Sequence, residues 1–291
     1  MDRFHRNVIW YRANVDLPDN KPLLKSYHVT GIPTTVVLDT KGEEVDRIIG
    51  FDGRSEWLKT LLGYLYGVDT LQDYLDRASA APTVAEEVAI AQKYLDRGEP
   101  KESLAWVDKA RRLRPGPDEK TAQALRFIEA QAWLATDPPK GIEALTAVAT
   151  DAKDPNAADA FSTLSGHYQR EAKNAKDVAA KQKAEESLMA LYHELLPSHQ
   201  NDAQFLNDYA WHCAELGVEL DHALAAAQRA AELGKQDPGI LDTVAEVYYK
   251  MGRSDQAVLT IDRALQQKPG DSYLEGQRAK FLKAGGSKVK H

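Results

Sequence analysis

The chain has 291 residues, a net charge of −7 at neutral pH and one cysteine, Cys213. This length predicts two domains, and the negative charge argues against nucleic acid as the main partner. A single cysteine excludes an internal disulfide, a CxxC motif and a cysteine-based zinc site. No apolar run reaches the roughly 18 residues of a membrane span. Because residues 1–6 also lack the apolar core of a signal peptide, we expect a cytoplasmic protein, or a periplasmic or secreted one if the true N-terminus lies upstream.

The first part of the chain predicts a small α/β unit. Strands are indicated by β-branched and aromatic residues, helices by apolar periodicity and the connecting turn by Gly42. The elements expected in chain order are a strand over 8–16, a helix over 22–27, a strand over 34–39, a strand over 44–49 and a helix over 54–66. The second and third strands are expected to pair in antiparallel fashion.

This order of elements resembles the C-terminal two thirds of a thioredoxin. The matching segments are 15–16 (VD), 27–34 (YHVTGIPT), 38–39 (LD) with Gly42, and 47–50 (RIIG). The resemblance implies a cis bond between Ile32 and Pro33. It also implies that the loop of Ile32, Pro33 and Thr34 faces a substrate groove.

The family's WCxxC motif is absent, and with it the thiolate pair that disulfide exchange requires. Cys213 lies in a predicted helix far along the chain, where a cysteine is usually a small buried hydrophobe. The module is therefore expected to be redox-silent as given, without catalytic residues in this chain. The alternative is a thiol–disulfide oxidoreductase whose CxxC segment precedes Met1.

The missing segment also leaves a gap in the predicted sheet. In the family, another strand lies between those matching 8–16 and 34–39, and without it both present unpaired backbone groups. The two strands pair directly, or another chain donates a strand in a strand-complemented assembly or homo-oligomer, or the recorded start is downstream of the true one. We favour the last of these hypotheses.

Residues 238–271 carry the clearest pattern in the second part of the chain. Large and small residues fall at the fixed offsets of a tetratricopeptide repeat, with its period of about 34 residues. The positions are occupied by Leu241, Val244, Ala245, Tyr248, Ala257, Ile261, Ala264 and Pro269. Gly252 is expected in the left-handed turn and Ser254 as the cap of the second helix. Because one hairpin cannot bury both faces, neighbouring repeats must stack on it.

Further units follow the same pattern less strictly. They cover residues 84–117, 121–154, 155–198 and 203–237, with a capping helix over 272–284. In the second unit Phe127 is assigned to the packing face, and Pro138 and Pro139 are expected to lengthen the turn. The charged stretch 171–186 is interpreted as a helix extending into solvent.

The predicted fold class is an α/β thioredoxin-like fragment followed by an all-α tetratricopeptide-repeat solenoid of about four repeats. A helix over 69–79 precedes a break at Pro82, because the residue before a proline disfavours helix. The predicted domains are residues 1–67, a connector over 68–82, and the repeats over 83–291.

No catalytic or metal-binding set stands out, and no cofactor is expected. By the repeat family's pattern, first-helix positions line a groove that binds a protein or peptide partner. The candidates are Asn207, Trp211, Glu215, Asp242, Glu246, Tyr249 and Lys250. Trp211 and Tyr249 either anchor a peptide, since aromatic residues dominate binding hot spots, or pack against the next repeat.

Overall fold

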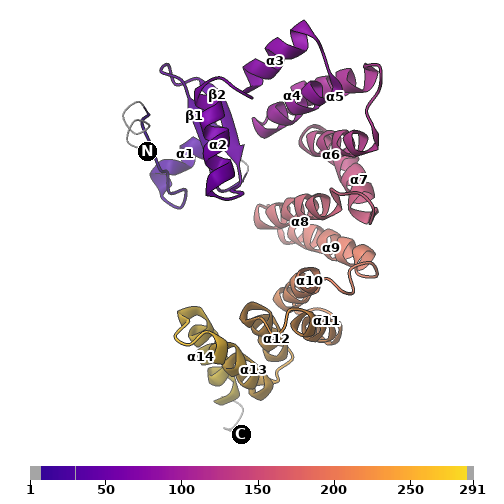
Figure 1. Ribbon diagram of the computed structural model, residues 1–291. Coiled ribbons are helices and arrows are strands. Elements are labelled where there is room, and N and C mark those ends of the chain that lie inside the picture. Colours follow the sequence, from indigo (N-terminus) through magenta and orange to yellow (C-terminus); the bar gives the residue numbers. More distant parts are fainter. Residues whose placement is uncertain (1–7, 30, 287–291) are drawn as a thin grey trace. The chain divides into compact units, whose positions relative to one another are not determined.

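The computed structural model describes residues 8–29 and 31–286, and this part of the chain is mostly helical (Figure 1). It forms two compact units, Met1–Leu164 and Ser165–His291, which we call unit 1 and unit 2. The division falls within helix α8. Each unit has its own helices and buried residues and is described separately.

The N-terminal part of unit 1 contains a β-hairpin covered by one helix. Strands β1 (Thr34–Leu38) and β2 (Glu44–Ile49) are antiparallel, with Thr34 opposite Ile49 and an irregularity after Val37. Helix α2 (Arg54–Leu65) packs on them through Leu61 and Tyr64. A 3₁₀ turn η1 (Pro18–Asn20) and helix α1 (Lys21–Ser26) precede the hairpin. The predicted hairpin and both helices of this region are confirmed.

The predicted strand over residues 8–16 is wrong. Within the described residues, β1 and β2 form a two-stranded sheet and pair only with each other, so 8–16 has no strand to pair with. The segment is held by side chains instead: the Trp10 ring lies 6.1 Å from that of Trp57, and the Tyr11 hydroxyl donates to Asn20. Direct pairing of 8–16 with β1 therefore does not occur. The Ile32–Pro33 bond is cis, as the thioredoxin resemblance implies.

Unit 1 continues with helical hairpins. The helices are α3 (Leu71–Ala80), α4 (Val84–Asp96), α5 (Pro100–Arg112), α6 (Glu119–Thr136), α7 (Pro138–Thr150) and the first part of α8 (Ala157–Lys173). Helix α4 packs along α5 and α6 along α7, while α6 also contacts both α4 and α5. Each hairpin thus covers the one before it, which is how helical repeats bury their faces.

Unit 2 repeats this arrangement. After the end of α8 come α9 (Val178–Leu195), α10 (Ala203–Leu216), α11 (Leu220–Leu233), α12 (Pro238–Lys250), α13 (Ser254–Gln267) and α14 (Ser272–Gly286). Helix α12 contacts both helices of the α10–α11 hairpin, and α14 contacts both helices of the α12–α13 hairpin. The predicted all-α repeat architecture and the C-terminal helix that caps it are confirmed.

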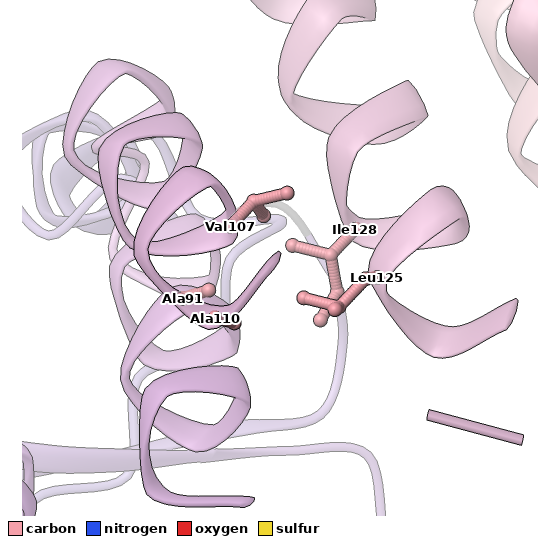
Figure 2. Close-up of a cluster of buried hydrophobic side chains, with 5 residues drawn as sticks. All are labelled: Ala91, Val107, Ala110, Leu125 and Ile128. Carbon is pink, nitrogen blue, oxygen red and sulfur yellow. The ribbon is translucent and has the colours of Figure 1, made fainter. Parts of the chain in front are cut away.

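Small residues set the spacing between neighbouring hairpins. Figure 2 shows Ala91, Val107 and Ala110 of the α4–α5 hairpin facing Leu125 and Ile128 of α6. All five are buried. Because the two alanines carry only a methyl group, the helix backbones approach closely and the α6 side chains fill the space between them.

We expect Ala110→Leu to lower the free energy of unfolding by about 1–3 kcal/mol, because extra methyl groups in a packed core force other side chains off their rotamers. Urea denaturation followed by circular dichroism measures this effect. Ala105→Leu, on the exposed face of the same helix, is the matched control and should change stability by less than about 0.5 kcal/mol. Equal losses for both variants would contradict the packing described for Ala110.

Several local predictions are corrected. Pro138 begins α7 directly, with Asp137 as its N-cap, because the first helical position needs no amide hydrogen; the turn is therefore short. The stretch 171–186 is not one extended helix: α8 ends at Lys173, and Asp177 caps α9 by accepting from the amide of Ala180. Ser254 is the first residue of α13 and makes no capping bond; the N-cap is Arg253.

Buried charges join the β-hairpin to the first helical repeat. The Asp46 carboxylate, 1% exposed, accepts from Lys93 Nζ of α4 at 2.8 Å and from the Leu71 amide at 2.7 Å. The Arg47 guanidinium donates to the Asp96 carbonyl at 2.9 Å, and that of Arg97 to the Val45 carbonyl at 2.7 Å. The three bonds to α4 and the residue after it join positions 47 to 52 apart in sequence, and together they fix β2 against the end of α4.

Candidate peptide-binding face

The residues predicted to line a groove lie on α10 and α12 of unit 2. Helix α10 starts at Asp202, whose carboxylate accepts from the amides of Gln204 and Phe205, and it ends at Gly217 with φ 70°. A left-handed residue of this kind terminates a helix without strain when it is glycine. The capped helix holds Asn207, Trp211 and Glu215 at four-residue spacing, which places them on one face.

Two of the predicted residues on α12 are covered by α14. Asp242 is 5% exposed and accepts from the Tyr273 hydroxyl at 2.9 Å and from Gln277 Nε2 at 3.1 Å. Burial raises the pKa of the Asp242 carboxyl. Glu246 is 6% exposed and is paired with the Lys280 ammonium. Both carboxylates therefore bind the capping helix in this structure.

The aromatic residue of α12 also packs on the capping helix. The Tyr249 ring lies 5.2 Å from that of Phe281, and Lys280 Nζ lies 5.1 Å from the Tyr249 ring centre. Of the two alternatives for this side chain, the structure has packing against the next helix. Lys250, at the end of α12, is exposed.

The face of α10 is more open. Trp211 is half-buried and Glu215 is exposed. Asn207 donates through Nδ2 to Asp208 at 3.4 Å, while its Oδ1 is buried and has no hydrogen-bond partner in the described part of the chain. An unsatisfied buried acceptor of this kind is unfavourable.

A neutral histidine connects this face to α8. Gln169 Nε2 lies 3.2 Å from His212 Nε2. The amide nitrogen can only donate, so His212 Nε2 is the acceptor and Nδ1 carries the proton, directed at Glu215 Oε2 at 3.4 Å. Burial lowers the pKa of His212, which favours the same neutral form. On this open face, Trp211 therefore lies between two polar features. One is the neutral pair of Gln169 and His212, and the other is the Glu215 carboxylate.

Sequence reasoning missed the residues that cover α12. Tyr273, Gln277 and Lys280 recur on one face of α14, at the spacing of successive helical turns. The sequence predicted a capping helix over 272–284 without assigning these side chains to either of its faces. The sequence did contain one signal of this contact. The acidic residues Asp242 and Glu246 are four positions apart on α12, and α14 carries hydrogen-bond donors at a similar spacing.

The predicted substrate loop of Ile32, Pro33 and Thr34 belongs to unit 1. Ile32 is 70% exposed, and the hydroxyl of Thr34 donates to the Gly31 carbonyl at 2.6 Å. Pro33 lies between them, and its carbonyl accepts from the Gly50 amide at 2.8 Å. The loop is thereby attached to the end of β2. Its role in holding a substrate stays a prediction.

Cys213 is completely buried within α10. Burial raises the pKa of its thiol from about 9 to about 11. The thiolate is the reactive form, so its fraction at pH 8 falls by roughly 100-fold. The helix position predicted a small buried hydrophobe, and the structure confirms it.

We expect Cys213 in the folded protein to react with a thiol reagent such as dithionitrobenzoate at least roughly 100-fold more slowly than an exposed cysteine. Stopped-flow absorbance at pH 8 gives the rate, and the same protein in strong denaturant provides the fast reference. Rapid reaction in the native state would show that the thiol is accessible and would contradict its buried position.

Within residues 8–29 and 31–286, no group of three or more His, Cys, Asp or Glu side chains is arranged to hold a metal ion. None of the described helices combines the length and the apolar character that crossing a membrane requires.

These features define a helical-repeat protein whose first-helix face is open on α10 and covered on α12. No family model matches the chain, and a search of curated proteins finds no match. Among solved structures, the chain is similar to a thermophilic TPR protein from Thermus thermophilus, with 21% identity, 69% of this chain and 99% of that chain covered, and a TM-score of 0.41. The helical-repeat architecture itself follows from the packing of α4–α7 and of α10–α14.

Proposed function

We propose that this chain is a protein-interaction scaffold that binds a peptide segment of a partner on the open face of α10. The observation that carries the proposal is the position of Trp211: its side chain is partly exposed, and the exposed Glu215 follows one helical turn later on the same face of α10. A partly exposed aromatic ring supplies apolar contact area at low entropic cost, and the Glu215 carboxylate supplies a charge.

The proposal limits the groove predicted from sequence. Asn207, Trp211 and Glu215 are the contact residues, and Lys250 is an accessible residue at the end of α12. Asp242, Glu246 and Tyr249 act instead through α14, which they hold in place. A peptide that reached them would have to displace the capping helix.

The test is an array of short peptides probed with the full chain, followed by fluorescence polarisation on the peptides selected. Trp211→Ala is expected to weaken binding by at least about 10-fold, as loss of a hot-spot aromatic does. Leu259→Ala is the matched control, because Leu259 is an exposed apolar residue on α13, and it should bind as the wild type does. Peptides that bind both variants equally, or no bound peptide at all, would refute the proposal.

We also propose that residues 1–67 form a thioredoxin-like module, followed by a connector over 68–82 and the repeats over 83–291. The support is the order β1, β2, α2 and the packing of α2 on the hairpin. The described residues of this region hold a two-stranded sheet, the short helix α1 and the longer helix α2, which is less than a whole domain of that fold. If two reactive thiols precede Met1 in the protein isolated from its own source, its intact mass will exceed 32.3 kDa.

A further inference from the structure

An open hollow lies on unit 2, lined by residues other than those of the proposed peptide face. It has a volume of about 680 Å³ and is lined by the end of α9, the start of α10 and most of α11. Its apolar walls are Leu196, Leu206, Ala225 and Ala226. A volume of this size is typical of sites that hold a small ligand or a few side chains.

The hollow exists because α11 is rich in alanine on this side. Leu206 is buried beneath it, while Ala225 is exposed on its wall. A leucine at either alanine position would fill much of the space. The walls therefore leave room for an apolar side chain supplied by another molecule.

One end of the hollow carries the carboxylate of Glu219, and its two oxygens differ in their hydrogen bonds. Glu219 Oε2 accepts from the Tyr209 hydroxyl at 2.8 Å and lies 3.0 Å from His193 Nε2. His222 Nδ1 is 4.0 Å from the same oxygen. No hydrogen bond to Glu219 Oε1 is found among the residues that the structure describes. The second oxygen is thus available to a donor from outside.

The charge balance of the hollow favours a cation. Arg229, at the other end, is paired with Glu232 at 3.2 Å and donates to Asn201 at 2.8 Å, so its charge is already compensated. Among the residues that line the hollow, Glu219 supplies the negative charge. The chain as a whole is also acidic, with a net charge of −7, which attracts basic partners.

We propose that this hollow is a second docking site, and that it binds a peptide segment in which a lysine or arginine adjoins an apolar side chain. The apolar side chain enters the space between Leu206 and the alanines of α11. The cationic group donates to Glu219 Oε1. This site does not rest on the proposed role of Trp211, because the two sets of residues are different.

The test uses the full chain labelled with ¹³C at alanine and leucine methyl groups and two capped probes, Ac-Ala-Leu-Lys-Leu-NH₂ and Ac-Ala-Leu-Glu-Leu-NH₂. The lysine probe is expected to shift the methyl signals of Ala225 and Ala226 with a Kd of about 1 mM or tighter. The glutamate probe should bind at least about 10-fold more weakly. Glu219→Gln keeps the shape of the side chain and should weaken the lysine probe by about 10-fold.

Two variants control for shape and charge. Ala225→Leu fills the hollow and should abolish the methyl shifts, while Ala105→Leu on the exposed face of α5 should not. Glu194→Gln removes an exposed carboxylate of α9 outside the hollow and should leave the affinity unchanged. Trp211→Ala should also bind the lysine probe normally, so failure of this site and failure of the α10 face are distinguishable.

Three results would overturn the proposal. The first is equal or tighter binding of the glutamate probe, which would assign the site to Arg229 and the histidines as an acidic-peptide site. The second is a shift of the Ala225 and Ala226 signals with protein concentration alone, which would show a second copy of the chain seated there. The third is the absence of methyl shifts with either probe.

Discussion

Asp46→Ala is expected to lower the free energy of unfolding of unit 1 by about 3–5 kcal/mol, the cost of breaking a buried ion pair by removing one partner. The Asp46 side chain is nearly inaccessible, and that of Lys93 is 12% exposed. Their bond of 2.8 Å connects the β-hairpin to α4. Without the carboxylate, the Lys93 ammonium stays in a mostly buried position with little compensation.

The carboxylate also satisfies backbone donors. Asp46 Oδ2 accepts from the Leu71 amide at 2.7 Å and Oδ1 from the Arg47 amide at 2.8 Å. The first of these amides begins α3, so the substitution also removes the acceptor from a helix start. Each buried donor left unsatisfied costs about 1–3 kcal/mol. The effect is therefore expected to exceed that of an apolar truncation of similar size.

Urea denaturation, with hydrogen exchange of the α3 and α4 amides, measures this loss and locates it. Asp52→Ala is the matched control, since Asp52 lies on the exposed loop after β2, and it should change stability by less than about 0.5 kcal/mol. Lys93→Met in the Asp46→Ala background should recover part of the loss, because it removes the uncompensated charge. A cost below about 1 kcal/mol for Asp46→Ala would show that the pair contributes little.

The sequence did not predict this ion network, although it did predict the hairpin that carries Asp46. β-Branched residues and the turn at Gly42 predicted β1 and β2 correctly. In that pattern Asp46 is simply a polar residue within the second of these strands. The bond to Lys93 joins residues 47 positions apart, and nothing local to either residue specifies it. Only the packing of β2 against α4 brings them together.

The predicted strand over 8–16 failed for a related reason. Its β-branched and aromatic residues fit a strand, but a strand exists only when another one pairs with it. In contrast, the repeat helices need little beyond their neighbours in sequence. Leu241, Ala245 and Ile261 were placed correctly on buried faces, because helical periodicity and small residues at close contacts are local properties.

The second repeat shows where local periodicity becomes ambiguous. The sequence assigned Phe127 to its packing face, where it is half-buried, while the fully or nearly buried residues of α6 are Leu125, Ile128, Ala130 and Ala132. Apolar residues occur on more than one side of α6, so the pattern alone does not choose the buried side. The short turn to α7 sets the rotation of the helix, and that turn was predicted to be longer than it is.

The shortness of this turn makes Gly141 the position where a single methyl group is expected to do most harm. Helix α6 ends at Thr136 and α7 begins at Pro138. Because only Asp137 lies between them, the end of α6 and the start of α7 stay close together. A Cβ at Gly141 would clash with the backbone nitrogen and Cα of Leu134, and would lie 2.7 Å from the carbonyl carbon of Trp133. All three are backbone atoms, which no rotamer change can move.

We therefore expect Gly141→Ala to lower the free energy of unfolding by about 3–5 kcal/mol, at the upper end of the cost of overpacking. Gly276→Ala is the matched control in α14, where an added Cβ meets nothing within 4 Å. There the same substitution should raise stability by about 0.5–1 kcal/mol, because alanine favours the helix over glycine. Urea denaturation of both variants shows whether each substitution lowers or raises the free energy of unfolding. Because intrinsic helix propensity favours alanine at both positions, a stabilising Gly141→Ala would mean that α6 and α7 are not in close contact.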